Sequence, residues 1–351
     1  MQIKTLNLKG FRNHKNFNIS FTGNTTLIIG SNGIGKTNIL EAIHMLATTK
    51  SMRATYDVEM IEHNKELATI TANVIDDGEE SKMELAIIDT PTSTNSSSKQ
   101  AKINGVKKSL NKFSGTLNSV LFSPSDIEIF SDTPSNRRKY LDSIFFQIDE
   151  PYKRAHRDYT KAVKQRNKIL ERIRESGKGR DLIELWDNRI IETGTEIQNK
   201  RTELANFINN KISDYAELIN GENTKVEFMY TINEISQTTI EENRNKEIAA
   251  ARTLVGPHRD DFSISLNKFN VGAYGSRGQQ RSVILALKLC EIDYINLHKG
   301  IRPILLLDDI FSELDEKHKE AVLNIIDLQQ TIITSAEETP IDKEVETLYL
   351  K

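Results

Sequence analysis

The chain has 351 residues, of which 28% are charged and 37% hydrophobic, and its formal net charge is −3. This length allows more than one domain with a sizeable core, and the composition is typical of a soluble globular protein. No apolar run approaches the ~20 residues of a transmembrane helix, and the first ten residues have no apolar signal-peptide core. The single cysteine, Cys290, excludes an internal disulfide and a cysteine-based zinc site. We therefore expect a cytoplasmic protein.

The first strong motif is GSNGIGKT at residues 30–37. The β-branched run 25–29 before it predicts a buried strand, and the run 37–46 after it has apolar residues at helical spacing. A strand, a glycine loop and a helix form a phosphate loop, in which backbone N–H groups and the helix N-terminus bind phosphate. Lys36 would reach the β- and γ-phosphates, and the Thr37 hydroxyl would bind Mg²⁺. The residues expected to bind ATP are Gly30, Ser31, Asn32, Gly33, Ile34, Gly35, Lys36, Thr37 and Asn38.

The middle of the chain changes character near Pro134. Before it, strands are expected at 67–76 and 83–89, with a hairpin turn at Asn104-Gly105. After it, two long helical stretches separated by a glycine turn predict an antiparallel helical hairpin. From about residue 255 strands and helices alternate again. The sequence therefore predicts one α/β domain built from residues 1–133 and 252–351, with a helical arm at 134–251 inserted between them.

The first predicted arm helix is strongly basic. Residues 153–180 contain eleven basic and three acidic residues, a net charge of +8 on a chain of net −3. This asymmetry favours a nucleic-acid-binding face, where phosphate contacts give affinity without sequence selectivity. A solvated helix face is the alternative. The candidate DNA contacts are Lys161, Lys164, Arg166, Lys168 and Arg172.

Two motifs near the end of the chain complete the pattern. The apolar run 304–309, ILLLDD, predicts a strand that ends in two acids. Asp308 would hold Mg²⁺, and Asp309 would orient or deprotonate the attacking water. Upstream, YGSRGQQR at 274–281 opens a helix expected at about 277–298. A serine-glycine helix start is a potential anion site, and an ordinary capped helix start is the alternative.

This order of motifs resembles that of ABC-type ATPases of the SMC class, in which the signature of one subunit closes on the phosphate loop of another. The resemblance implies an ABC/SMC-type P-loop ATPase head with Ser276, Arg277, Gly278 and Gln279 as a signature acting in trans, and Asp315 as the D-loop residue. More closely, the chain resembles the RecF family of bacterial recombination mediators, although Met52 stands where that family usually has histidine. The matching strings are FRNH (11–14), GSNGIGKTN (30–38), VLFSPSD (120–126), TPSNRRKYLD (133–142), GPHRDD (256–261), YGSRGQQR (274–281) and ILLLDDIFSELD (304–315).

The resemblance implies a nucleoid-associated, weak DNA-dependent ATPase. It would form an ATP-dependent homodimer, act as a clamp on gapped or double-stranded DNA, and help RecO and RecR load RecA. The alternative is a non-hydrolysing scaffold that ATP holds together. Two local alternatives also stay open: Arg12 could contact nucleotide or form a strand-end salt bridge, and residues 258–260 could orient the junction of head and arm or support the nucleotide site.

Overall fold

The computed structural model describes residues 1–90, 97–221, 224–312, 316–337 and 343–350. The chain divides into two units, which are described separately. The first unit contains residues 1–127, 215–223 and 281–351, and the second contains 128–214 and 224–280. Among the described residues, no helix combines the length and the apolar character needed to cross a membrane.

The unit boundaries differ from the predicted boundaries at 134 and 251. Residues 252–280 group with the helical unit because strand β10 (Asp261–Leu266) pairs antiparallel with β9 (Val226–Thr231). Residues 215–223 group with the first unit, where the Tyr215 hydroxyl donates to Asp293 Oδ2 at 2.6 Å. Composition alone does not reveal contacts between distant parts of the chain, so a boundary predicted from composition misses them.

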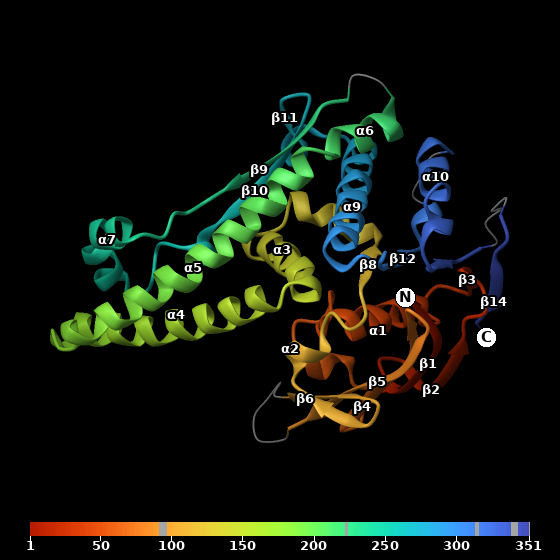
Figure 1. The fold of residues 1–351 in the computed structure, drawn as a ribbon, viewed down its shortest axis with the longest axis horizontal. Coiled ribbons are helices and arrows are strands. Elements are labelled where there is room, and N and C mark those ends of the chain that lie inside the picture. Colours follow the sequence, from red (N-terminus) through yellow and green to blue (C-terminus); the bar gives the residue numbers. More distant parts are fainter. Residues whose placement is uncertain (91–96, 222–223, 313–315, 338–342, 351) are drawn as a thin grey trace. The chain divides into compact units, whose positions relative to one another are not determined.

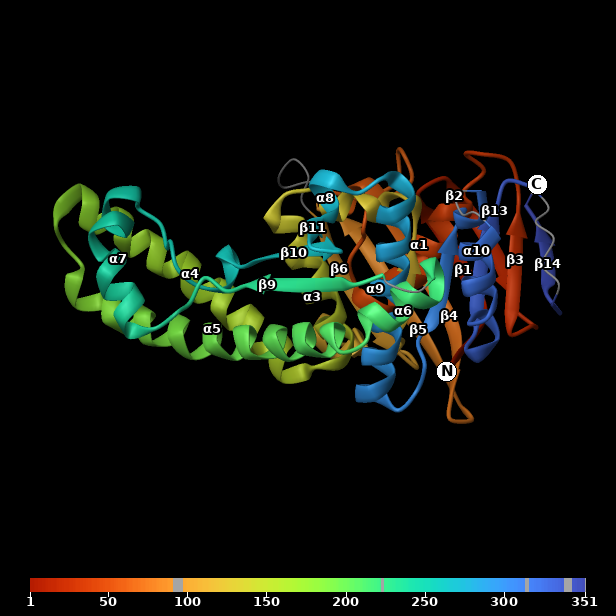
Figure 2. The same cartoon turned by 90° about the horizontal axis from the view of Figure 1, so that it is seen from above.

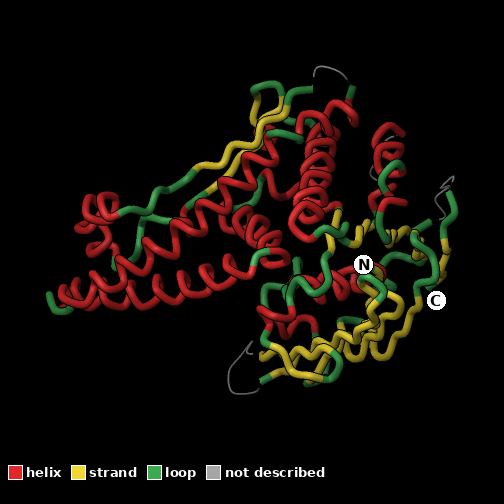
Figure 3. Tube along the Cα trace, in the orientation of Figure 1, coloured by secondary structure: helices red, strands yellow, loops and turns green. Residues whose placement is uncertain are grey.

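Two sheets form the first unit (Figure 3). One is antiparallel with the strand order β2-β1-β4-β5-β6-β7, and the other is parallel with the order β14-β3-β13-β12-β8. The antiparallel strands are β1 (Gln2–Phe11), β2 (His14–Ser20), β4 (Leu67–Asp76), β5 (Glu79–Asp89), β6 (Ser97–Ile103) and β7 (Val106–Lys108). The parallel strands are β3 (Thr25–Ile29), β8 (Ser119–Phe122), β12 (Ile304–Asp308), β13 (Thr331–Ser335) and β14 (Glu346–Tyr349). Strands β3, β8, β12 and β13 are buried throughout, as expected for a parallel sheet covered on both faces.

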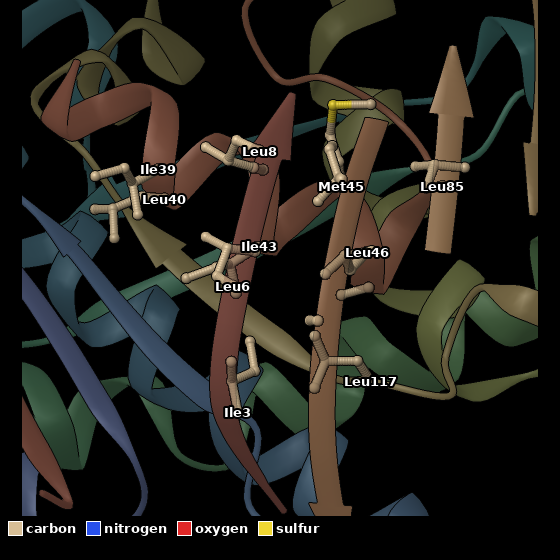
Figure 4. Packing of buried hydrophobic residues seen from close by; sticks show 14 of the residues in the cluster. Ile3, Leu6, Leu8, Ile39, Leu40, Ile43, Met45, Leu46, Leu85 and Leu117 are labelled. Carbon is tan, nitrogen blue, oxygen red and sulfur yellow. The ribbon is translucent and has the colours of Figure 1, made fainter. Parts of the chain in front are cut away.

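Helix α1 (Lys36–Thr48) packs against strands of both sheets and carries the centre of the core. Eleven of its 13 residues are buried, so it is a core helix rather than an amphipathic surface helix. Figure 4 shows Ile39, Ile43 and Leu46 of α1 among side chains of β1 and β5. Because α1 begins at the phosphate loop, this packing fixes the loop to the rigid part of the unit. The remaining helices that lie wholly or mainly in this unit are α2 (Leu110–Phe113), α6 (Ile212–Asn220), α9 (Arg277–Lys299) and α10 (Glu316–Leu323).

The second unit contains the predicted helical hairpin. Helices α4 (Glu150–Ser176) and α5 (Arg180–Asn209) lie side by side in both Figure 1 and Figure 2, joined by a turn in which Gly177 and Gly179 have φ of 69° and 102°. A side chain would be strained at either φ, so the glycine turn is required. The unit also contains α3 (Pro134–Ile148), α7 (Gln237–Ala250), α8 (Val271–Tyr274) and the sheet β11-β10-β9, in which β11 is Phe269–Asn270.

Residues 258–260 hold the second unit together. The fully buried Asp260 carboxylate accepts hydrogen bonds from Gln198 Nε2 at 2.9 Å and Arg201 NH1 at 3.3 Å, both on α5. Burial lowers the pKa of His258 to about 4, so its ring is neutral. The ring therefore donates from Nε2 to the Thr253 carbonyl at 3.1 Å and accepts at Nδ1 from the Tyr159 hydroxyl of α4 at 2.6 Å. These contacts give residues 258–260 a structural role within this unit.

Candidate nucleotide site

The phosphate loop is held from outside by the turn between β1 and β2. Gly35 has φ 113°, and a Cβ there would lie 2.6 Å from His14 Nε2 and 2.7 Å from Asn13 Oδ1. Asn13 Nδ2 donates to the Ile34 carbonyl at 2.9 Å, and His14 Nε2 lies 3.1 Å from the Gly35 carbonyl. Burial lowers the pKa of His14, which favours the neutral ring that donates this hydrogen bond. Only glycine fits between this turn and the loop.

The predicted magnesium ligands meet at the carboxyl edge of the parallel sheet. Strand β13 lies between β3, which leads into the phosphate loop, and β12, which ends at Asp308. Asp308 Oδ1 accepts from Thr37 Oγ1 at 2.9 Å and from Thr334 Oγ1, on β13, at 2.8 Å. Burial raises the pKa of Asp308, while these two hydrogen bonds and the charge of Arg53 act in the opposite direction. Hydroxyl and carboxylate oxygens are the donors that Mg²⁺ prefers, so these residues fit the ion.

Lys36 is bonded to the loop it follows. Its Nζ donates to the Gly30 carbonyl at 2.5 Å and the Ser31 carbonyl at 3.2 Å. The ammonium group therefore lies inside the curl of the loop, where a phosphate would compete for it.

Asp309 leaves the strand in an unusual backbone conformation. Its φ is 49°, and its N–H donates to the carbonyl of Thr334 at 3.1 Å. The left-handed region costs an ordinary residue about 1–2 kcal/mol, although aspartate tolerates it better than most. The chain therefore turns sharply between the two acids, so their side chains do not follow the simple alternation of a strand. Such outliers cluster at functional sites.

Arg12 forms the salt bridge that the sequence left as one of two alternatives. Its Nε and NH2 donate to the two carboxylate oxygens of Glu41 at 2.9 and 2.8 Å, and its NH1 donates to the Glu59 carbonyl at 2.9 Å. Beside the loop lies a cavity of about 490 Å³ that has room for the rest of a nucleotide. It is lined by Arg12, Asn13, Asn38, Arg53, Glu59 and Ile61.

The signature segment starts helix α9 with a reciprocal cap. Ser276 N–H donates to Gln279 Oε1 at 2.9 Å, and Gln279 N–H donates to Ser276 Oγ at 3.3 Å. This is the capped helix start that the sequence left as an alternative to an anion site. However, residues 276–279 are all exposed, and a Cβ at Gly278 would meet only Ser276 Oγ, at 4.0 Å. Among the described residues, no atom lies close enough to a Cβ at 278 to require a glycine there.

Comparison with known proteins assigns the chain to a family. The model described as the RecF/RecN/SMC N terminal domain matches residues 2–349. A DNA replication and repair protein RecF from Agathobacter rectalis is 36% identical over 339 residues, covering 95% of this chain and 92% of that protein. One from Ligilactobacillus salivarius is 35% identical, with 95% and 91% covered. The chain belongs to the RecF family.

Solved structures agree with this assignment. A structure of the recombination mediator RecF with ATP has a TM-score of 0.88 and 33% identity, and the match covers 99% of this chain and 95% of that one. An SMC head domain from Pyrococcus furiosus, at 18% identity and a TM-score of 0.51, shares the fold. The predicted ABC/SMC-type ATPase head with an inserted helical arm is therefore confirmed.

One predicted DNA contact in this RecF-family chain is wrong. Arg166 is fully buried, with Nε 2.7 Å from Asp187 Oδ1, NH2 2.5 Å from Glu247 Oε2 and NH1 3.0 Å from Thr253 Oγ1. It faces the core because it lies four residues from both Ala162 and Leu170, which are buried on the same row of α4. It cannot contact DNA.

The other four candidates are exposed and share one face of α4. Their spacing of three, four and four residues keeps them in a single row, and two further exposed arginines extend that row toward the start of the helix. We call this row the basic stripe. It consists of Arg154, Arg157, Lys161, Lys164, Lys168 and Arg172.

Several site residues were not assigned from the sequence. Asn13 and His14 belong to the quoted string FRNH, which was the available signal, but their contact with the phosphate loop depends on tertiary structure. Thr334, on β13, was given no role from the sequence. The predicted D-loop residue, Asp315, lies outside the described residues.

Proposed function

We propose that this chain is a DNA-binding ATPase of recombinational repair, which binds ATP with Mg²⁺, closes head to head on a second copy, and clamps DNA. The observation that carries the proposal is the complete half-site formed by the phosphate loop, Thr37 and Asp308. The exposed signature segment, residues 276–279, is the second support. The RecF relatives and the RecF–ATP structure support the same assignment.

Each residue of the half-site has a distinct task. Lys36 would exchange the Gly30 and Ser31 carbonyls for the β- and γ-phosphates. Thr37 and Asp308 would hold Mg²⁺, which when bound neutralises charge on those phosphates. Asp309 would orient the attacking water. Hydrolysis then removes the γ-phosphate contacts, so the dimer reopens.

The signature would complete the site of the second copy. Ser276 Oγ and the first N–H groups of α9 can donate to a γ-phosphate, and the helix N-terminus adds partial positive charge. Gly278 leaves room for that approach because its Cα carries no side chain, and among the described residues only Ser276 Oγ would come within 4.0 Å of a Cβ there. A phosphate loop on one copy and a signature on another form two equivalent sites under two-fold symmetry.

The basic stripe is the proposed DNA contact. From residue 154 to 172 the helix rises about 27 Å, so six cations follow one straight line. Such a row suits contacts with a phosphate backbone and gives no sequence selectivity. Arg157 is partly compensated, because its Nε lies 3.0 Å from Asp158 Oδ1. RecR and RecO are the expected protein partners, since the RecF–ATP structure is described within the RecFOR pathway.

Analytical ultracentrifugation with and without ATP and Mg²⁺ tests the dimer. We expect ATP to dimerise the wild type, Ser276→Arg to abolish dimerisation while ATP still binds, and the matched control Thr195→Arg, at an exposed threonine of α5, to behave as wild type. A wild type that stays monomeric in saturating ATP, even with DNA, would contradict the clamp. Asp309→Asn should trap a long-lived ATP dimer, whereas in a non-hydrolysing scaffold it would change little.

A further inference from the structure

Two pairs of large apolar side chains are exposed, and each pair lies next to one half of the proposed site. Phe269 and Tyr274 are 64% and 75% exposed, and Met52 and Tyr56 are 45% and 47% exposed. A single exposed apolar residue needs no explanation, but exposed groups gathered beside a functional segment indicate an interaction surface.

The first pair is held in place beside the signature. The Phe269 and Tyr274 rings have centroids 6.2 Å apart at an interplanar angle of 71°, an edge-to-face arrangement. Tyr274 ends α8, two residues before Ser276. Asn270 Oδ1 caps α8 by accepting from the Ala273 N–H at 3.1 Å, so the ring pair and the signature segment share one anchored stretch of chain.

Gln280 strengthens this anchor. Its Nε2 donates to the Val271 carbonyl at 3.2 Å, which ties the first turn of α9 to α8. At Gly272 a Cβ would lie 2.7 Å from the Phe130 carbonyl, so α8 is closely packed. The two rings therefore present an ordered surface rather than a loose loop.

The second pair belongs to a segment of which Arg53 and Glu59 line the nucleotide cavity. Met52 and Tyr56 lie on either side of Arg53 in the sequence, and Arg53 lines the cavity. Ser51 Oγ accepts from the Arg53 N–H at 3.0 Å, and Glu59 Oε1 accepts from the Tyr56 N–H at 3.2 Å. This segment is thus also fixed by its own hydrogen bonds.

We propose that, in the ATP-bound dimer, Phe269 and Tyr274 of one copy pack against Met52 and Tyr56 of the second copy. This inference rests on the proposed function, which brings the signature of one copy to the phosphate loop of the other and so brings the flanks of both segments together. Two-fold symmetry forms the contact twice. Thioether–aromatic and aromatic–aromatic contacts are both favourable.

The contact supplies most, but not all, of the area that such a dimer requires. If each exposed side chain buries roughly 100 Å², the eight side chains of the two contacts bury on the order of 800 Å². A specific interface needs about 1,000 Å², and phosphate contacts alone would leave the dimer small and polar. The apolar contacts would therefore supply most of the buried interface area. Closure of the dimer would then depend on these side chains as well as on the phosphate contacts.

Cross-linking tests the contact directly. The native Cys290 is buried, so the double variant Met52→Cys/Tyr274→Cys has only two reactive thiols. With a short bismaleimide, we expect covalent dimers in ATP and Mg²⁺ and none without ATP. The control Met52→Cys/Leu185→Cys, whose second thiol replaces an exposed leucine of α5, should give none in either condition.

Dimer affinity separates this inference from the proposed function. Tyr274→Ala should raise the dissociation constant of the ATP dimer about tenfold or more, because the side chain is lost twice, whereas Val106→Ala, at another exposed apolar residue, should not change it. ATP dimerisation of Tyr274→Ala with wild-type affinity, and no cross-link in the cysteine pair, would overturn the contact while the clamp stands. If the wild type never dimerises, the proposed function fails first, and the contact fails with it.

Discussion

Arg166 gives the sharpest test of how the arm is built. In the basic run it is one cation among eleven, but its guanidinium is fully buried between Asp187 and Glu247. Arg166→Met keeps much of the volume of the side chain and removes the charge. Lys164→Met makes the same change two residues away on the exposed face. The pair therefore separates a structural cation from a proposed DNA-contacting cation on one helix.

The size of the effect follows from what the substitution leaves behind. Removing one partner of a buried ion pair costs about 3–5 kcal/mol, because the other charge stays buried without compensation. Here Asp187 keeps Arg244, and Glu247 keeps the N–H of Leu254 at 2.8 Å. We therefore expect a loss near the lower limit, about 3 kcal/mol. In a unit of this size that lowers the melting temperature by roughly 6–12 °C. Lys164→Met should change stability by less than about 0.5 kcal/mol.

Urea unfolding followed by circular dichroism measures the stability, and fluorescence anisotropy at 15 °C measures DNA affinity while both variants are folded. We expect Arg166→Met to lose stability and keep DNA affinity, and Lys164→Met to do the reverse. Combining Arg166→Met with Asp187→Asn and Glu247→Gln should recover part of the loss, because no unpaired charge then stays buried. An Arg166→Met protein of full stability and weakened DNA binding would refute the burial argument.

Three further outcomes are expected. Gly278→Ala should keep stability and ATP binding, since its Cβ would meet nothing closer than 4.0 Å among the described residues, but should abolish the ATP dimer in ultracentrifugation. Replacing the last four members of the basic stripe with alanine should make the salt dependence of duplex DNA binding weaker. The plot of log affinity against log salt concentration should become less steep by about 3–4, measured by anisotropy from 50 to 300 mM salt. The pKa of His258 falls from 6.5 in the unfolded chain to about 4 in the fold. Between pH 6.5 and pH 4 the unfolded chain therefore binds more protons than the folded chain, so the free energy of unfolding should fall as the pH drops through this window. Measured by urea titration, His258→Gln should make that decline shallower.

The residues predicted most securely from the sequence belong to short, rigid motifs. The phosphate loop and the Asp308 strand each combine a special residue with a buried strand, so a few positions determine both structure and chemistry. Arg166 was misassigned although the signal was present: Tyr159, Ala162, Leu170 and Ile173 form the apolar row on which it lies. Only the partner acids, Asp187 on α5 and Glu247 on α7, explain how a cation is accommodated there.

Other features depended on tertiary structure. Ile3 is out of phase with Leu6 and Leu8 in an ideal strand, yet all three are buried, because the pairing of β1 with β4 shifts register between Ile3 and Thr5. Helix α7 was missed because its sequence has no apolar stripe, and Ile240 and Glu247 are its only side chains described as buried. A search for apolar periodicity does not detect a helix whose buried side chains are one isoleucine and one glutamate in an ion pair.

The distribution of these parts suggests how DNA and ATP are linked. The phosphate loop, Asp308 and the nucleotide cavity all belong to the first unit, whereas the basic stripe and the signature both belong to the second. Within the second unit, α4 is bonded to residues 258–260 through Tyr159, and the strand that follows, β10, pairs with β11 just before α8 and Ser276. The basic stripe and the signature are therefore linked by contacts within one unit. Under the proposed function, DNA bound along α4 would therefore contact the same unit whose signature meets the ATP of a second copy.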